Sequence, residues 1–420
     1  MPDNSFPGPE TVHRFELDNG ITVLIYENAA SQSIIIDGII RAGALVESRE
    51  TAGLANYTAD MLLRGTKKRS FDMIFEEVEA VGASVDFGAG RHVSDFFGSC
   101  LAEDLDLILG IIADSLRQPV FPENQVEKVR GEIITGLHIR ANDTGQMAGL
   151  HFRELLYKDH PYGKSSEGYL DSIQRLNRDA LAEYHEQFFG PKGMIITLVG
   201  AIEPKSGLAL VQKAFGDWDT GQLIVPSVPG ARRPSSRLQT HHEMPDKTQT
   251  DIMLGVPGPL RAADDYLEAS MANTILGMFG MYGRLGQNVR ESQGLAYYSF
   301  SRLAGGLGPS PWYVSTGVSP DNVDLALDSI FHEIERIIEE PVTEEELADS
   351  QAFRTGALPV SLETNQGVAN ILTDIELFDL GLDYLHRLPE KIFAMTPETV
   401  QAAARHYLSS EEIAIAIAGP

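Results

Sequence analysis

The sequence contains a single cysteine, Cys100, among its 420 residues. One thiol excludes an internal disulfide and any zinc cluster that is built from several cysteines. Cys100 stands in the apolar stretch FFGSCLAED. We therefore expect a small buried residue rather than a nucleophile.

Positive charge and long apolar runs are also scarce. The chain has 33 Lys and Arg against 60 Asp and Glu, a net charge of −27. This balance argues against a nucleic-acid partner, because phosphate binding needs concentrated positive charge. No run approaches the eighteen apolar residues of a membrane-spanning helix, and no signal peptide is visible at the start. We expect a cytoplasmic protein that does not insert into membranes.

The sequence that is present repeats one pattern of elements. Residues 101–130, LAEDLDLILGIIADSLRQPVFPENQVEKVR, correspond to 318–351, VSPDNVDLALDSIFHEIERIIEEPVTEEELADSQ. Both predict an apolar helix, a Pro-Val turn and an acidic helix. Residues 176–204 and 395–420 likewise share a helix that leads into an apolar strand ending in glycine. A repeat of about 200 residues predicts two homologous domains rather than a solenoid.

Composition suggests where the two domains meet. Proline, glycine and serine concentrate in residues 216–237, which we interpret as a linker between domains 1–215 and 238–420. Strands are predicted at 13–27 and 33–47, with helices at 103–117 and 122–141. Strands in blocks with long helices between them favour an α+β fold, in which each domain packs a mostly antiparallel sheet against helices.

One segment of the first half resembles a catalytic motif without its chemistry. Residues 53–66 read GLANYTADMLLRGT. They resemble the zinc helix of the pitrilysin/insulinase peptidases, where H-x-x-E-H stands between Gly-Leu-Ala and Met-Leu-x-x-Gly-Thr. Histidines four residues apart share one helical face and bind one zinc, and the glutamate accepts a proton from the zinc-bound water. Here Asn56 and Asp60 replace the histidines, and Ala59 replaces the glutamate.

The same resemblance implies a third zinc ligand, a glutamate on the later helix that begins near Pro122. That spacing falls on Gly136, which has no side chain. Glu132 lies one helical turn earlier and faces the same way, so a shifted site of oxygen ligands stays open. Such a site suits a hard cation better than zinc. The resemblance predicts that this chain binds no metal, with Asn56, Ala59, Asp60 and Gly136 as degenerate zinc-site positions.

A second segment keeps its chemistry. Residues 283–297, GRLGQNVRESQGLAY, resemble the family's pattern S-R-L-x-x-x-[LI]-R-E-x-x-G-L-A-Y. Many catalytic members use its arginine and tyrosine to hold substrate, and Arg290 and Tyr297 fall on those positions. The alternatives are an arginine that pairs at a helix end and an ordinary strand tyrosine. Tyr298 is also a candidate, one residue out of register.

Together the two segments suggest a division of labour. In two-subunit bacterial members of the family, one chain carries zinc and the other carries the arginine-tyrosine pair. The resemblance implies that this chain is the second kind: inactive alone, with two domains arranged as a clamp, and partnered by a homologous zinc-bearing subunit that cleaves unfolded peptides. The alternatives are a scaffold subunit like those of respiratory complexes and a peptide-binding clamp. His151 and the pair His241-His242 are interpreted as surface or packing residues.

Overall fold

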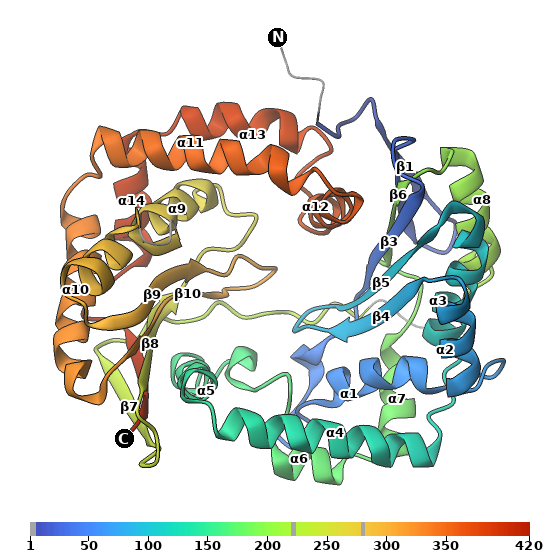
Figure 1. Cartoon of the computed structure of the whole chain (residues 1–420), viewed down its shortest axis with the longest axis horizontal. Helices are drawn as coiled ribbons and strands as arrows, with labels where there is room; N and C mark the ends of the chain where they lie inside the picture. The colour runs from blue at the N-terminus through green and yellow to red at the C-terminus, as the bar shows by residue number, and fades with distance from the viewer. Residues whose placement is uncertain (1–5, 220–223, 279–281) are drawn as a thin grey trace. The chain divides into compact units, whose positions relative to one another are not determined.

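The computed structural model describes residues 6–219, 224–278 and 282–420, so residues 220–223 of the predicted linker lie outside the described residues. The chain forms two compact units (Figure 1). The first unit comprises Met1–Leu137, Ser165–Ser227 and Leu358–Leu388. The second comprises His138–Lys164, Val228–Ala357 and Pro389–Pro420.

The first unit is built on a six-stranded sheet with the order β1-β2-β6-β3-β5-β4. Strands β2 and β6 are parallel, and every other neighbouring pair is antiparallel. The two central strands, β3 and β6, consist mostly of apolar residues, as expected for strands that are covered on two faces. The strands are β1 Val12–Glu16, β2 Thr22–Glu27, β3 Ser33–Ile40, β4 Ser84–Ala89, β5 Ser94–Leu101 and β6 Ile195–Gly200.

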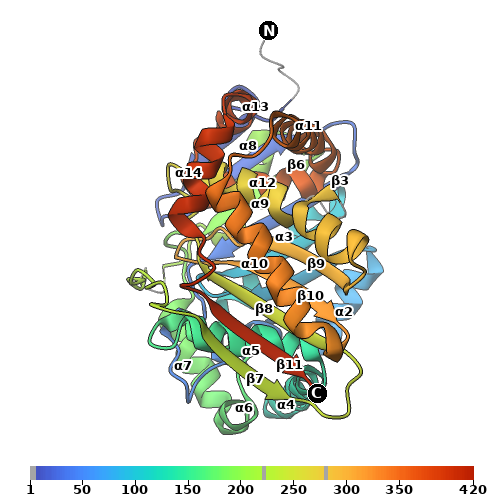
Figure 2. The ribbon, with the colours of Figure 1, turned by 90° about the vertical axis from the view of Figure 1, so that its left-hand side faces the viewer.

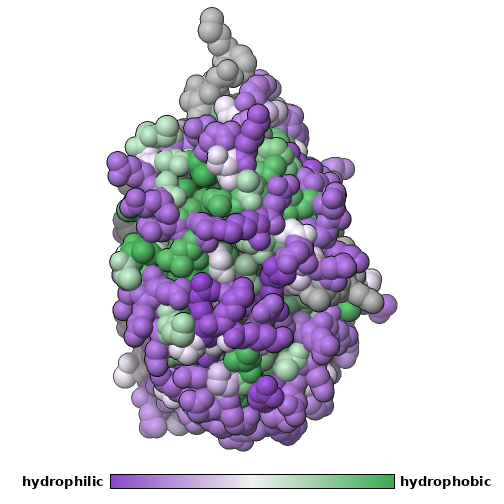
Figure 3. All heavy atoms as spheres, turned by 90° about the vertical axis from the view of Figure 1, so that its right-hand side faces the viewer, coloured by the Kyte–Doolittle hydropathy of each residue, from purple (hydrophilic) through white to green (hydrophobic). Residues whose placement is uncertain are grey.

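Helices of the N-terminal half cover one face of this sheet. Helix α3, which lies within the predicted helix 103–117, buries Ile108 and Ile112 against it. The α2 helix ends at Ala80, and Gly82 turns the chain into β4 with a φ of 61° that favours glycine. Helices in contact with strands of the sheet are α1 Leu54–Met61, α2 Phe71–Ala80, α3 Leu105–Arg117 and α8 Pro204–Phe215. The helices α4 Glu123–Ala141, α6 Leu170–Arg175 and α7 Arg178–Phe188 pack with α1 in a separate apolar cluster. Figure 3 views this side and shows mainly hydrophilic side chains with apolar ones between them.

A helix from the C-terminal half covers the opposite face. Helix α12 (Asn365–Leu377) packs Val368, Leu372 and Ile375 against apolar residues of β2, β3 and β6. Figure 1 shows the sheet between α12 on one side and α3 with α8 on the other. A polar contact fixes the position of α12, because Thr373 lies within hydrogen-bond distance of Thr197 and donates to Asp37.

The second unit repeats this architecture. Its five-stranded sheet has the order β7-β11-β8-β10-β9, with β7 and β11 as its parallel pair. That order matches β2-β6-β3-β5-β4 of the first unit strand by strand. Figure 2 shows the strands as β9, β10, β8, β11 and β7 from top to bottom. They are β7 Leu238–Glu243, β8 Thr250–Pro257, β9 Ala296–Leu303, β10 Pro311–Val318 and β11 Ala414–Gly419.

The second sheet also receives a helix from the other half of the sequence. Helix α5 (Thr144–Leu156) packs against β7, β8 and β11. On the other side of the unit, α9 contacts β9 and α14. The remaining helices are α9 Tyr266–Asn273, α10 Val323–Glu339, α11 Glu344–Ser361, α13 Tyr384–Phe393 and α14 Pro397–Tyr407. Helices α11 and α13 each run from one unit into the other.

The predicted α+β class with two similar, mostly antiparallel sheets is confirmed. The compact units differ from two continuous halves of the chain, because each half contributes one helix to the sheet of the other unit. Within the described residues, no helix is both long enough and apolar enough to cross a bilayer.

Candidate functional site

Helix α1 carries three of the four predicted zinc-site positions. Its N-terminus begins at Gly53, whose φ is 95°, and the buried Glu47 carboxylate accepts hydrogen bonds from the Gly53 and Ala55 amides at 3.0 and 2.7 Å. A carboxylate at this end of a helix accepts hydrogen bonds from the free amides, and its negative charge interacts favourably with the positive end of the helix dipole. Tyr57 donates to the Val126 carbonyl at 2.5 Å, which joins α1 to α4.

The four predicted zinc-site positions hold an amide, a methyl group, a carboxylate and a glycine. The Asn56 amide donates to the Ser166 carbonyl at 2.7 Å. Ala59 is buried and has no group that can accept a proton. Gly136 is exposed on α4, and a Cβ placed there would meet nothing within 4 Å. Across the described ranges, no three His, Cys, Asp or Glu side chains are grouped so that they could hold a metal ion.

Asp60 lies instead in a small charged cluster in which the Arg64 guanidinium is the positive group. The Arg64 guanidinium donates to Glu132 at 2.9 Å and its charge also acts on Asp60. Asp60 keeps solvent-exposed surface, but surrounding protein displaces enough water to raise its pKa to about 6, with Asp86 and Glu132 adding to the rise. Arg64 therefore offsets the acidic charge that a bound cation would otherwise neutralise.

The second predicted site lies on an unusual backbone. Arg290 stands in a π-helix, Gly286–Ser292. This conformation is rare and often occurs at functional sites. The Arg290 side chain is 44% exposed and forms a loose ion pair with Glu291, at 3.7 Å. Gly294, with a φ of 63°, ends this segment, and its amide donates to the Arg290 carbonyl at 3.0 Å.

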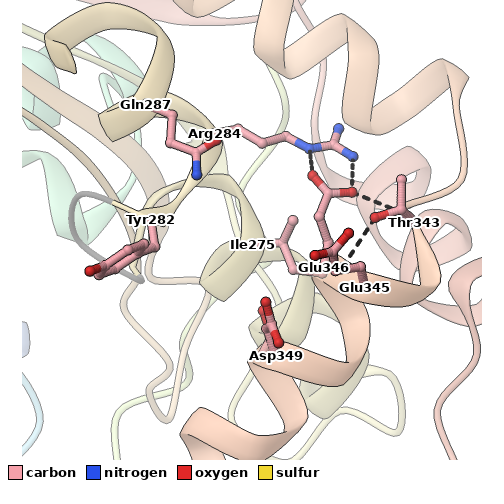
Figure 4. A pocket seen from close by; sticks show the side chains of 9 residues that line it. Ile275, Tyr282, Arg284, Gln287, Thr343, Glu345, Glu346 and Asp349 are labelled. Atoms are coloured by element: carbon pink, nitrogen blue, oxygen red, sulfur yellow. Dashed lines mark hydrogen bonds and ion pairs between the residues drawn. The ribbon is translucent and has the colours of Figure 1, made fainter. Parts of the chain in front are cut away.

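A buried ion pair fixes the start of the π-helix segment. Arg284 donates to both carboxylate oxygens of Glu346 at 2.7 and 2.8 Å (Figure 4). Glu346 also accepts from the Thr343 amide at 2.9 Å, within the first turn of α11. Burial alone would raise the pKa of Glu346, but the bonds from Arg284 and Thr343 lower it to about 2. The pair borders a pocket of about 500 Å³.

Helix α10 holds the same segment from another side. Asn288 donates to the buried Glu333 at 2.7 Å, and Gln293 donates to the Ser329 hydroxyl at 2.9 Å. The polar side chains before and after Arg290 are thus bound to the scaffold. Arg290 itself is left exposed, as expected for a group that contacts a ligand.

Tyr297 is also exposed, and a bulge in β9 explains why. Tyr298 pairs with Gly317 on β10, whereas Ala296 pairs with the next residue, Val318. Tyr297 is therefore the extra residue of a β-bulge, a feature that can redirect a side chain beside an active site. The side chain is 63% exposed. Its hydroxyl has no hydrogen-bond partner in the described part of the chain.

The neighbouring Tyr298 is engaged elsewhere. Its hydroxyl donates to Asp251, a buried residue of β8. Burial, followed by the hydrogen bond to Asp251, raises the pKa of Tyr298. Of the two adjacent tyrosines, only Tyr297 has a hydroxyl available to a ligand.

Two of the histidines that the sequence singled out meet in the second unit. The rings of His151 and His242 lie 4.6 Å apart, and His151 is 3.2 Å from Glu154. The contact joins α5 to β7. No sequence signal links His151 with His242. The bulge at Tyr297 and the hydrogen bond between Tyr298 and Asp251 also have no sequence signal, because both depend on how the strands pair.

Two family descriptions match the chain over complementary stretches. Residues 22–165 match "Insulinase (Peptidase family M16)", and residues 175–353 match "Peptidase M16 inactive domain". The predicted zinc-site positions of α1 fall in the first match, and Arg290 and Tyr297 fall in the second. The chain belongs to the insulinase family of peptidases, family M16.

Its similarity to individual proteins extends over nearly the whole length. An uncharacterized zinc protease of Streptomyces coelicolor is 25% identical and is covered over 90% of its length by 98% of this chain. The mitochondrial-processing peptidase subunit beta of Saccharomyces cerevisiae is 24% identical, over 89% of this chain and 82% of that protein. A solved peptidase M16 inactive domain of Pseudomonas fluorescens has a TM-score of 0.90 at 24% identity, covering 97% of this chain and 98% of its own.

Proposed function

We propose that this chain is the non-zinc, substrate-positioning subunit of a heterodimeric zinc metalloendopeptidase that cleaves unfolded peptides. The observation that carries the proposal is the contrast between the two segments. Arg290 and Tyr297 are exposed on a segment that hydrogen bonds to neighbouring helices hold in place, whereas the predicted zinc-site positions hold Asn56, Ala59 and Asp60. Of the alternative functions, a scaffold subunit would have no need of the exposed pair, and a peptide-binding clamp would use the pair for binding alone.

The two exposed side chains suit the handling of a peptide. A guanidinium presents several fixed N–H donors, which suit peptide carbonyl oxygens. A tyrosine hydroxyl can donate to the carbonyl oxygen that becomes negative when the peptide bond is attacked. Arg290 would hold the peptide and Tyr297 would stabilise the developing charge.

The remaining chemistry would come from a homologous partner that carries the zinc ligands and the general base. This chain offers no base at Ala59 and no ligand at Gly136, so the proposal assigns it no metal. One relative, the yeast mitochondrial-processing peptidase subunit beta, is by its name part of a multi-subunit peptidase. Subunit pairing therefore has a precedent within the family.

The test uses the pair reconstituted with the zinc-bearing homologue from the same organism. Tyr297→Phe removes one hydroxyl, and Arg290→Ala removes the guanidinium. We expect Tyr297→Phe to lower kcat on the order of a hundredfold, since one lost oxyanion donor costs about that much. Arg290→Ala should lower kcat/KM, because it removes donors that hold the peptide. Complex formation and the zinc content of the pair should not change.

Arg302→Ala is the matched control, because Arg302 is an exposed arginine on the same strand as Tyr297. It should leave the rate within about twofold, as most surface substitutions do. Normal activity of the Arg290→Ala and Tyr297→Phe pairs would contradict the proposal.

A further inference from the structure

The exposure of Tyr297 depends on the bulge staying where it is. If β9 and β10 paired without a bulge, Tyr297 would lie opposite Val318. Strand alternation would then place it on the same face as Ser299 and Ser301, which are 7% and 2% exposed. A shift of one residue moves a side chain to the other face of a sheet. Something must therefore hold the register next to Tyr297.

The residue next to the bulge is anchored across three strands. Tyr298 on β9, Gly317 on β10 and Asp251 on β8 are paired in one row of the sheet. The Tyr298 side chain crosses β10 to donate to Asp251. A Cβ on Gly317 would stand 2.6 Å from the Tyr298 ring and 2.9 Å from the Asp251 carboxylate. Only glycine leaves room for this crossing.

Asp251 is itself held in place from several directions. It is 2% exposed, and it also accepts hydrogen bonds from Thr144 on α5 and from the Gln249 amide, the latter at 3.0 Å. The Tyr298 hydroxyl remains a donor at neutral pH, because burial and the hydrogen bond to Asp251 raise its pKa. A buried group with several partners is a rigid anchor, since each lost bond would leave an unpaired polar atom.

We propose that Tyr298 and Asp251 are positioning residues that hold the bulge and so keep Tyr297 directed at substrate. The inference rests on the proposed function of Tyr297. Tyr298 contacts no substrate, and its effect on catalysis passes through Tyr297. Gly317 contributes to the same arrangement, because it has no side chain that would obstruct the Tyr298 ring.

A double-mutant cycle in the reconstituted pair tests this inference. Tyr298→Phe keeps the ring and removes the bond to Asp251. We expect kcat to fall on the order of tenfold to a hundredfold with little change in KM, because a misplacement of about 1 Å costs that much in the transition state. In a Tyr297→Phe background, the same change should have almost no further effect on kcat.

The matched control is Tyr407→Phe, which removes another tyrosine-aspartate bond in the same unit, from Tyr407 to Asp265 at 2.8 Å. It should leave kcat unchanged. If Tyr298→Phe does not fold, Gly317→Ala, which displaces the Tyr298 ring, goes through the same cycle.

The outcomes separate the two claims. An unchanged kcat in Tyr298→Phe would overturn the positioning role, and so would an equal loss with and without the Tyr297 hydroxyl. An unchanged kcat in Tyr297→Phe alone would overturn the proposed function, on which this inference depends.

Discussion

Asp60 and Glu132 lie near the guanidinium of Arg64, which offsets part of their negative charge. The guanidinium donates to Glu132 at 2.9 Å. In a zinc peptidase the corresponding helix supplies neutral imidazoles to a divalent cation. Here the chain supplies both the acids and the cation.

The raised pKa of Asp60 gives a pH-dependent prediction. Its folded-state pKa of about 6 lies above the ordinary value of 3.8. Between these values the folded protein keeps a proton that the unfolded chain releases. This contribution to stability is thus complete below about pH 4 and is lost as pH rises through 6. Asp60→Asn should stabilise the protein at pH 7 by less than about 1 kcal/mol, after solvent screening, and not at pH 4.

Urea unfolding at the two pH values measures the difference. Asp72→Asn, which changes an exposed aspartate of α2, is the control for the substitution itself. Equal effects of Asp60→Asn at pH 4 and pH 7 would show that the pKa of Asp60 is not raised.

The sequence located the candidate residues but not their surroundings. The frame around Arg290 and Tyr297 pointed to both residues, and both are exposed. It did not explain why Tyr297 rather than Tyr298 is available. That difference depends on Asp251, which lies 47 residues away in the sequence. A partner so distant follows only from the pairing of β8, β9 and β10.

At the scale of elements, hydrogen bonds to neighbouring helices hold the segment from Arg284 to Tyr297 in place. Two other helices hold it, through Glu346 on α11 and Glu333 on α10. The sequence pattern predicted the two helices that do the holding. It did not predict the π-helix, because a π-turn and an α-turn have similar apolar spacing over so few residues.

Removing the Glu346 carboxylate should strongly destabilise the protein around this segment. The Arg284 side chain is 4% exposed, so Glu346→Ala leaves a buried guanidinium without its carboxylate. We expect a loss of about 3 kcal/mol or more in the free energy of unfolding at pH 7. Because the folded pKa of Glu346 is about 2 against an ordinary 4.5, the difference from wild type should shrink as pH falls from about 4.5 towards 2.

Denaturant unfolding from pH 3 to pH 7 checks both the size and the pH dependence. Glu345→Ala removes an exposed neighbour on the same helix and should cost under about 1 kcal/mol. A Glu346→Ala protein as stable as the Glu345→Ala protein would show that the ion pair does not hold the segment.

At the scale of the whole molecule, the two halves of the sequence depend on each other. Helix α12 covers Leu24, Ile35 and Val199 of the first sheet, and α5 covers strands of the second. The repeat predicted two similar sheets, and this was confirmed. The exchange of helices could not be predicted, because an amphipathic helix shows which face is buried but not which sheet buries it.

Splitting the chain tests this dependence. A fragment of residues 1–219 contains the first sheet without α12, so an apolar face of β2, β3 and β6 would be open to water. We expect neither 1–219 nor 220–420 to unfold cooperatively when produced alone, and the coexpressed fragments to form one soluble complex. Circular dichroism melting of each fragment and of the complex is the measurement. A cooperative transition of 1–219 alone would show that α12 is dispensable.

We propose that this chain supplies the substrate contacts and that a partner supplies the zinc chemistry. Peptide cleavage by this chain alone, by the zinc-bearing homologue alone and by the coexpressed pair, each with and without a chelator, tests this division. We expect cleavage by the pair, abolished by the chelator, and none by this chain alone. Chelator-sensitive cleavage by the isolated chain would contradict it.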